Sequence, residues 1–239
     1  MKEWAKAIVY SLVFLFLVQQ FLYNKVYVQT EGMAPNIIPG DYLLMNKWDK
    51  SAEHGSIMIF EQPTIDTSKL FVQRFIGMPG DTISLSNGQL IRNSDTILEH
   101  YSIKLDTHRL YSIRPETSLD CKTCNWDLDN FGPVVIPSDG MKIRIDQNNL
   151  HLYKKALALE LSDSLAISDN SENIVIEHTF SRDYYFSLGD NRHNTIDSRF
   201  FGIIPEENII GKTETILFHF HLNSPGFFAL ERAFKSLNK

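Results

Sequence analysis

The sequence has few of the residues that build metal sites or disulfide frameworks. Only two cysteines occur among its 239 residues, Cys121 and Cys124, in the sequence CKTC. A structural zinc ion needs four ligands, and no second CxxC or HxxxH pair completes such a set. We therefore expect no metal site and no cofactor. The two cysteines are interpreted as a small loop disulfide or as two free thiols.

Clustered positive charge is also missing. The formal net charge is −6, and no block of Lys and Arg stands out along the chain. A nucleic-acid-binding surface normally shows such a cluster, so we expect no nucleic-acid partner. No internal repeat is visible. The polar stretch over residues 162–173 predicts an exposed connection.

Only one long apolar run is present, over residues 4–26. Spanning a bilayer takes about 20 mostly apolar residues in a helix. Lys2 lies before the run and Lys6 lies near its start. Positive charge at this end favours a cytoplasmic amino terminus. The competing interpretation is a cleaved signal peptide, but no small-x-small cleavage site follows the apolar segment. We expect an uncleaved transmembrane anchor over residues 1–27 and a single domain outside the cytoplasm over residues 28–239.

The rest of the chain is dominated by short apolar runs bounded by turn residues, a pattern typical of strands. Asn87-Gly88 stands between two such runs and predicts a two-residue hairpin turn. Residues 150–161 are rich in Leu, Lys, Ala and Glu, and they predict one short helix. The expected strands are 41–47, 56–60, 70–76, two arms within 81–93, 141–146, 183–188 and 213–222. The predicted fold is mainly β, carried on a single amino-terminal transmembrane helix.

Three stretches carry a family resemblance. They are TEGMAPNIIPGDYLLMNK (30–47), FVQRFIGMPGD (71–81) and GDNRHNTIDSRFFGIIPEENIIGK (189–212). Together they resemble the type I signal peptidase (leader peptidase) family, membrane-anchored serine proteases that cut signal peptides from exported proteins. NFGPVVIPSDGMKI (130–143) is similar to the segment that links motifs in this family. The resemblance implies the family's β domain up to about residue 212, with variable insertions at 97–125 and 162–179.

The reactive groups that the resemblance implies are missing. The family has a nucleophilic serine before the Met of the first stretch and a basic lysine before the Arg of the second. Here these positions are Gly32 and Gln73. A serine hydroxyl needs a base to take its proton, and a lysine serves as that base only when its pKa falls well below about 10.4. Glycine has no nucleophile, and a glutamine amide is far less basic than an amine.

The residues that resemble the family's supporting groups are present. By the resemblance, Thr30 helps to stabilise the oxyanion and Thr195 orients the base. The supporting loop of the third stretch contributes Asp190, Asn191 and the buried ion pair of Asp197 with Arg199. We interpret these four loop residues mainly as maintenance of the fold, since a turn rich in Gly, Asp and Asn uses such side chains for backbone hydrogen bonds.

These observations predict a pseudoenzyme of the signal peptidase family at the bacterial cytoplasmic membrane, with its β domain on the outer, periplasmic side. Its expected partners are signal peptides, exported proteins or an envelope protein. Strand addition binds a peptide through main-chain hydrogen bonds, so it does not require the missing dyad. We expect one wall of the peptide groove to be formed by Glu31, Met33, Ala34 and Pro35.

The alternative hypothesis is an active signal peptidase with a relocated nucleophile, Thr30, and with His193 or Glu31 as its base. Thr30 and Gly32 face the same side of an extended segment. Two residues span up to about 7 Å, however, whereas reacting atoms must approach to about 3 Å. A third hypothesis is a structural envelope protein that binds no peptide.

Overall fold

The main body of the protein is an eight-stranded antiparallel sheet with strand order β1-β2-β13-β3-β4-β11-β12, in which β14 also pairs with β13. The computed structural model describes residues 3–63, 68–105, 126–161, 175–220 and 230–237, without the side chains of residues 15–21, 63, 68 and 69. The strands of this sheet are β1 (Tyr23–Tyr27), β2 (Asp41–Asn46), β3 (Ile57–Pro63), β4 (Ser68–Gly77), β11 (Tyr184–Leu188), β12 (Ile204–Pro205), β13 (Ile209–His219) and β14 (Lys235–Ser236).

A second group of elements packs beside β11. It contains a four-stranded sheet of order β7-β6-β5-β8 and a two-stranded ribbon of β9 and β10. Its elements are β5 (Thr82–Ser86), β6 (Gln89–Arg92), β7 (Asp95–Thr96), β8 (Phe131–Val135), β9 (Lys142–Asp146), α2 (Leu150–Glu160) and β10 (Val175–Thr179). One continuous hydrophobic core joins these elements to β11 through Phe186 and Leu188. The mainly β fold predicted from the sequence is confirmed.

Several local predictions are confirmed by the structure. Asn87 and Gly88 take φ angles of 49° and 76° between β5 and β6, as a two-residue hairpin with two positive φ values requires. The predicted helix at 150–161 is α2, which buries an apolar face that includes Leu152 and Leu157. The apolar alternation of β2 places Leu43 and Met45 in the core.

Other elements differ from the sequence-based expectation. The strands expected at 56–60 and 70–76 are longer, because their ladder continues from Ile57 opposite Arg74 to Pro63 opposite Ser68. A one-turn helix, α3 (Ser198–Phe201), was not expected, and Asp197 caps it by accepting from Arg199 N. The polar connection at 162–173 and both cysteines lie outside the described residues.

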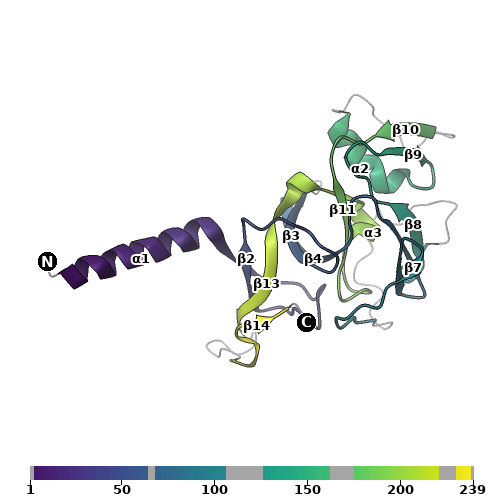
Figure 1. Cartoon of the computed structure of the whole chain (residues 1–239). Coiled ribbons are helices and arrows are strands. Elements are labelled where there is room, and N and C mark those ends of the chain that lie inside the picture. The colour runs from purple at the N-terminus through teal and green to yellow at the C-terminus, as the bar shows by residue number, and fades with distance from the viewer. Residues whose placement is uncertain (1–2, 64–67, 106–125, 162–174, 221–229, 238–239) are drawn as a thin grey trace.

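Helix α1 (Glu3–Leu22) projects away from the sheet, on the side opposite to α2, β9 and β10 (Figure 1). Residues 23–27, which the sequence places in the anchor, instead form β1 and pair with β2 over their full length. Within the described part of the chain, no helix meets the length and hydropathy that a membrane span requires.

Candidate active site

Gly32 occupies the turn that connects β1 to β2. Its carbonyl accepts a hydrogen bond of 3.0 Å from Asn191 N. A Cβ added to Gly32 would lie 3.0 Å from Thr195 Oγ1 and 3.4 Å from Thr195 Cβ. A side chain at position 32 would therefore point at Thr195, after the neighbouring atoms had moved by a few tenths of an ångström. The structure thus brings Gly32 and Thr195 together.

Gln73 lies in β4 and is buried, with 3% of its surface exposed. Its Nε2 donates to Ile196 O at 2.5 Å, and its Oε1 accepts from Ser187 Oγ at 2.6 Å. Both polar groups of the amide, the NH2 and the carbonyl oxygen, therefore have a partner within the protein. Because an amide is neutral and very weakly basic, this side chain holds the site together and does not abstract protons.

Both dyad positions contact the same short loop. Gly32 faces Thr195, and Gln73 binds the carbonyl of the next residue, Ile196. Gly189, at the start of this loop, must be glycine, because an added Cβ would lie 2.4 Å from Thr195 Oγ1 and 2.5 Å from Gly32 O. Such close backbone approach is possible only without a side chain. The loop therefore fixes the geometry around the positions of the missing nucleophile and base.

Asp190 anchors this loop to β4. Arg74 donates to both carboxylate oxygens of Asp190, through Nε at 2.8 Å and Nη2 at 2.7 Å. Asn36 Nδ2 adds a third hydrogen bond of 2.7 Å. The Arg74 and Asp190 side chains are 5% and 0% exposed. A buried bidentate pair of this kind orients both partners strongly, so Asp190 is held firmly against β4.

Asp197 and Arg199 form a second ion pair, with both side chains 0% exposed. Arg199 donates to the carboxylate at 2.9 Å and 2.7 Å, and to the carbonyls of Leu128 and Arg192 at 2.6 Å each. Asp197 also accepts from Gly189 N at 3.2 Å. The pair therefore ties α3 to both ends of the loop. Its predicted pairing and burial are present in the structure.

Residues of the segment expected to be variable also reach the site. The Tyr101 ring lies under the Arg74 guanidinium, whose Cζ is 3.7 Å from the ring centroid. Burial, and after it the charge of Glu99, raises the pKa of Tyr101 well above its ordinary value, so the phenol donates to Glu99. Glu99 also accepts from Arg192 Nη2 at 2.5 Å. The sequence offers no motif in this segment that identifies these contacts.

The backbone of the same segment binds the loop as well. Lys104 N donates to Asp190 O at 2.9 Å, and Arg192 N donates to Lys104 O at 3.0 Å. Ser102 O accepts from Asn36 Nδ2 at 2.8 Å. Residues 99–104 are thus part of the site's support, although only residues up to 105 of the expected insertion are described.

The expected groove residues divide into two groups. Thr30, Glu31 and Pro35 are exposed and Ala34 is half-buried. Met33 is only 3% exposed and belongs to the hydrophobic cluster beneath β2. The prediction that Met33 lines the groove is wrong, because the turn after Gly32 directs this side chain into the core.

The two bases considered for Thr30 have partners of their own. His193 Nε2 lies 2.8 Å from Asp129 Oδ1, and the His193 side chain is 3% exposed. Glu31 Oε2 accepts from Asn194 Nδ2 at 3.2 Å. His193 is therefore oriented by a carboxylate outside the turn that carries Thr30.

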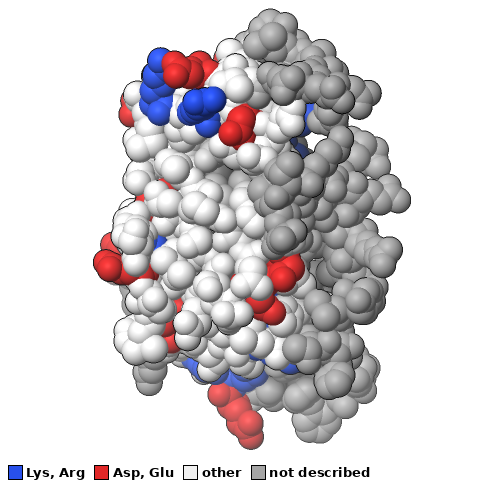
Figure 2. Space-filling model, turned by 90° about the vertical axis from the view of Figure 1, so that its right-hand side faces the viewer, with Lys and Arg blue, Asp and Glu red and all other residues white. Residues whose placement is uncertain are grey.

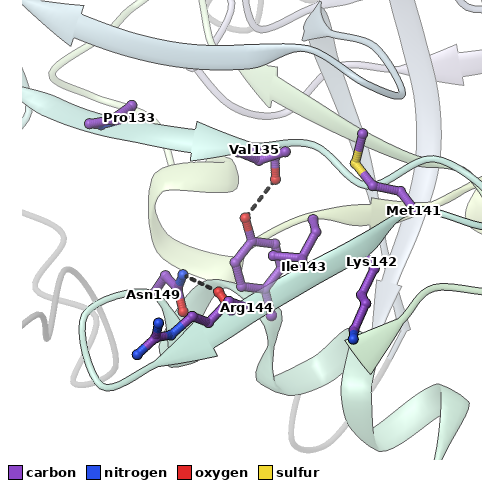
Figure 3. Close-up of a pocket in the computed structure, with 8 residues that line it drawn as sticks. Pro133, Val135, Met141, Lys142, Ile143, Arg144 and Asn149 are labelled. Atoms are coloured by element: carbon purple, nitrogen blue, oxygen red, sulfur yellow. Dashed lines mark hydrogen bonds between the residues drawn. The ribbon is translucent and has the colours of Figure 1, made fainter. Parts of the chain in front are cut away.

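A cavity of about 360 Å³ lies elsewhere, between β8, β9 and α2. Its lining includes Val135, Ile143, Arg144 and Tyr153 (Figure 3). The Tyr153 hydroxyl donates to Val135 O at 2.6 Å. Figure 2 shows the right-hand side of the view in Figure 1, where blue and red side chains gather near the top and further red side chains lie at mid-height. Neither Gly32 nor Gln73 lines the cavity, so it is separate from the candidate site.

Comparisons with known proteins agree with the motifs at this site. The family model described as "Signal peptidase, peptidase S26" matches residues 1–218. A signal peptidase I of Buchnera aphidicola is 25% identical over 235 residues, covering 87% of this chain and 74% of the relative. A signal peptidase I P of Bacillus subtilis subsp. natto is 27% identical over 221 residues, covering 90% of this chain and 88% of the relative.

A solved structure was also found, the crystal structure of a signal peptidase I from Enterococcus faecalis. It is 19% identical and has a TM-score of 0.32, covering 69% of this chain and 97% of that chain.

Proposed function

Because this chain belongs to the signal peptidase family, peptidase S26, we propose that it is a member without peptidase activity that binds extended segments of exported chains. The proposal places it at the outer face of the bacterial cytoplasmic membrane. An envelope protein that presents an extended segment is the other occupant that this groove would accept.

The hydrogen bonds of Gln73 carry the proposal. Its amide is held between Ile196 O and Ser187 Oγ, and the residue opposite Thr195 is Gly32, which has no side chain. Serine-type hydrolysis needs a nucleophile and a group that accepts its proton. Neither is supplied at these two positions, while the surrounding ion pairs and loop contacts are intact.

The edge of β4 supports binding by strand addition. The ladder between β4 and β11 covers only Arg74 to Gly77. Among the described residues, the preceding part of β4 therefore pairs on one side only, with β3. Val72 packs on the cluster that contains Val28 and Met33, so this free edge lies near the segment that leads to Gly32. A peptide added here would use main-chain hydrogen bonds and would not need the dyad.

Anchoring by α1 is supported by its side chains. Ile8, Val9, Leu12, Val13 and Phe14 are each between 50% and 66% exposed on the isolated helix. Leaving so much apolar surface in water is unfavourable, at roughly 25 cal/mol for each Å². A lipid environment removes this cost, and Lys2 and Lys6 at the amino-terminal side favour a cytoplasmic amino terminus.

The test uses the full chain in cells with a photo-crosslinking amino acid at Ala34. Exported precursors or one specific envelope protein should be captured from position 34. The matched control is the same amino acid at Val175, which is 54% exposed on β10, in the second group of elements. Capture from neither position by a folded, membrane-inserted protein would contradict the binding role.

Catalysis is tested separately with purified protein and a signal peptide that carries an Ala-x-Ala site. We expect no cleavage and no labelling by a serine-reactive inhibitor. Thr30 is an exposed residue that carries a hydroxyl, and this observation keeps the alternative of an active peptidase open. Cleavage that disappears in Thr30→Ala would overturn our proposal and establish that alternative.

A further inference from the structure

The cavity between β8, β9 and α2 lies between two strand edges. In the described part of the chain, β8 pairs only with β5, and β9 pairs only with β10. Pro133 and Val135 of β8 line one side of the cavity, and residues 142–144 of β9 line another (Figure 3). An unpaired edge is a row of main-chain N–H and C=O groups that can bind a further strand, so proteins usually block or cover it.

The edge of β8 is blocked. Pro133 has no N–H to donate, and Val135 O already accepts a hydrogen bond of 2.6 Å from the Tyr153 hydroxyl. Tyr153 comes from α2, and its side chain is buried. The side of the cavity formed by β8 and Tyr153 is therefore mainly an apolar wall, with few main-chain groups for an added strand.

The edge of β9 is open where it faces the cavity. Asn149 Nδ2 donates to Arg144 O at 3.2 Å, and Asn149 Oδ1 accepts from Asp146 N at 2.9 Å. A strand added at this edge would bind the same two main-chain groups, so the edge already pairs with one amide. Main-chain groups in an antiparallel ladder point to alternate edges. Lys142, two residues before Arg144, therefore directs its own N–H and C=O away from β10.

Two cations on the exposed face of β9 share one carboxylate of β10. Lys142 and Arg144 are both exposed, since side chains two residues apart lie on the same face of a strand. Glu177 stands opposite Arg144 in the ladder, but its ion pair is with Lys142. Asp146, at the end of β9, accepts from Asn148 N in the turn that follows. A carboxylate on a strand at the free edge would face Arg144, and opposite charges that meet across strands stabilise the pairing.

We propose that the free edge of β9 is a peptide-binding site, which takes up by strand addition an extended segment with acidic side chains at alternate positions. The segment would bond to the main chain of Lys142, place a carboxylate opposite Arg144, and lie against the wall of Val135 and Tyr153. This site belongs to the second group of elements and shares no residue with the groove beside Gly32. The inference is therefore independent of the proposed function.

The main-chain groups decide between a peptide and a smaller anion. A free carboxylate or an anionic amphiphile could pair with Arg144, but it would leave the N–H and C=O of Lys142 without a strand partner. An extended chain satisfies both, because its own N–H and C=O groups recur every two residues along one edge, as those of β9 do. The structure therefore favours a peptide.

The test measures fluorescence anisotropy with the purified full chain in a neutral detergent. The probe is a labelled hexapeptide of alternating valine and glutamate with blocked ends, and the control peptide has lysine in place of glutamate. We expect only the acidic peptide to bind. Arg144→Gln should weaken its binding by about three- to tenfold, the range for an exposed charge pair that includes a hydrogen bond. Arg92→Gln, on β6, removes the same charge from the same group of elements and should leave the affinity unchanged.

Strand addition is tested by two variants of equal charge. Lys142→Gln keeps the main-chain N–H at the free edge, whereas Lys142→Pro removes it without removing a bond to β10. We expect the proline variant to bind the acidic peptide much more weakly than the glutamine variant. Circular dichroism checks that both are folded, and if the proline variant is not, the two arginine variants and the two peptides still decide.

Several results would overturn the proposal. Equal affinity of folded Lys142→Pro and Lys142→Gln would show that β9 forms no main-chain bond to the peptide. Equal binding of the basic peptide, or equal losses in Arg144→Gln and Arg92→Gln, would show that Arg144 does not select acidic side chains. Displacement of the peptide by equimolar dodecyl phosphate would show a site for anionic amphiphiles. Capture from a photo-crosslinker at Ala34 should be unchanged in Arg144→Gln, whichever way the proposed function is decided.

Discussion

At the scale of single residues, two substitutions separate this site from the chemistry of its family. Gly32 leaves open the position next to Thr195, and Gln73 stands where the family has a basic amine, with an amide whose two polar groups have partners. A buried amine would require desolvation, whereas an amide with satisfied hydrogen bonds does not carry that cost. The residues present at these two positions therefore supply no nucleophile and no amine base.

Restoring both groups should restore a trace of cleavage. In Gly32→Ser with Gln73→Lys, the new hydroxyl would point at Thr195 and the new amine would lie among Ile196 O and Ser187 Oγ. We expect slow cleavage of a peptide with an Ala-x-Ala site, measured by mass spectrometry.

The two single variants are the controls for this prediction. Neither should cleave above background, because nucleophile and base act as a unit and their effects are not additive. Activity in Gly32→Ser alone would show that another residue accepts the proton. An inactive but correctly folded double variant would mean that the site has lost more than the dyad.

At the scale of elements, the loop from β11 to α3 is held by two buried ion pairs. Asp190 with Arg74 fixes it to β4, and Asp197 with Arg199 fixes it to α3 and to the segment before β8. Breaking a buried pair leaves an uncompensated charge, which is more costly than the net value of the pair itself. The geometry near Thr195 therefore depends on these contacts.

Asp197→Ala should lower the free energy of unfolding by about 3–5 kcal/mol, because the fully buried Arg199 loses its counter-ion. Urea unfolding of the full chain in detergent micelles measures the change. Lys142→Ala is the matched control, since it removes an ion pair with Glu177 whose side chains are 61% and 59% exposed. Exposed pairs contribute little, so this variant should unfold as the parent protein does. Equal unfolding curves for both variants would contradict the bracing role of Asp197.

At the scale of the whole molecule, α1 projects from the β domain and continues without a linker into β1 (Figure 1). This arrangement gives the proposed topology a simple consequence. With the amino terminus in the cytoplasm, every strand from β1 onward would lie on the outer side of the membrane, together with the proposed groove.

Protease added to intact spheroplasts should therefore degrade the β domain, because its exposed segments are on the outer side. A tag at the amino terminus should remain protected until the membrane is permeabilised. Immunoblotting for both ends of the chain measures the result. Protection of the β domain in intact spheroplasts would exclude the outward topology and the binding of exported chains on that side.

The sequence alone determined the family, the mainly β character, the Asn87-Gly88 hairpin and helix α2. These features depend on local chemistry: glycine's access to positive φ, apolar periodicity and motifs read within a short stretch. The absence of a serine and a lysine at Gly32 and Gln73 was also visible without a structure, since it concerns residue identity only.

Only the tertiary structure decided what surrounds those residues. Met33 turns into the core, Ser187 donates to Gln73, and Tyr101 stacks on Arg74 from a segment that carries no motif. Trp48 likewise comes to the end of α1 only because β1 pairs with β2. These contacts join residues far apart in the chain, and their formation depends on strand register and close packing, which no local pattern encodes.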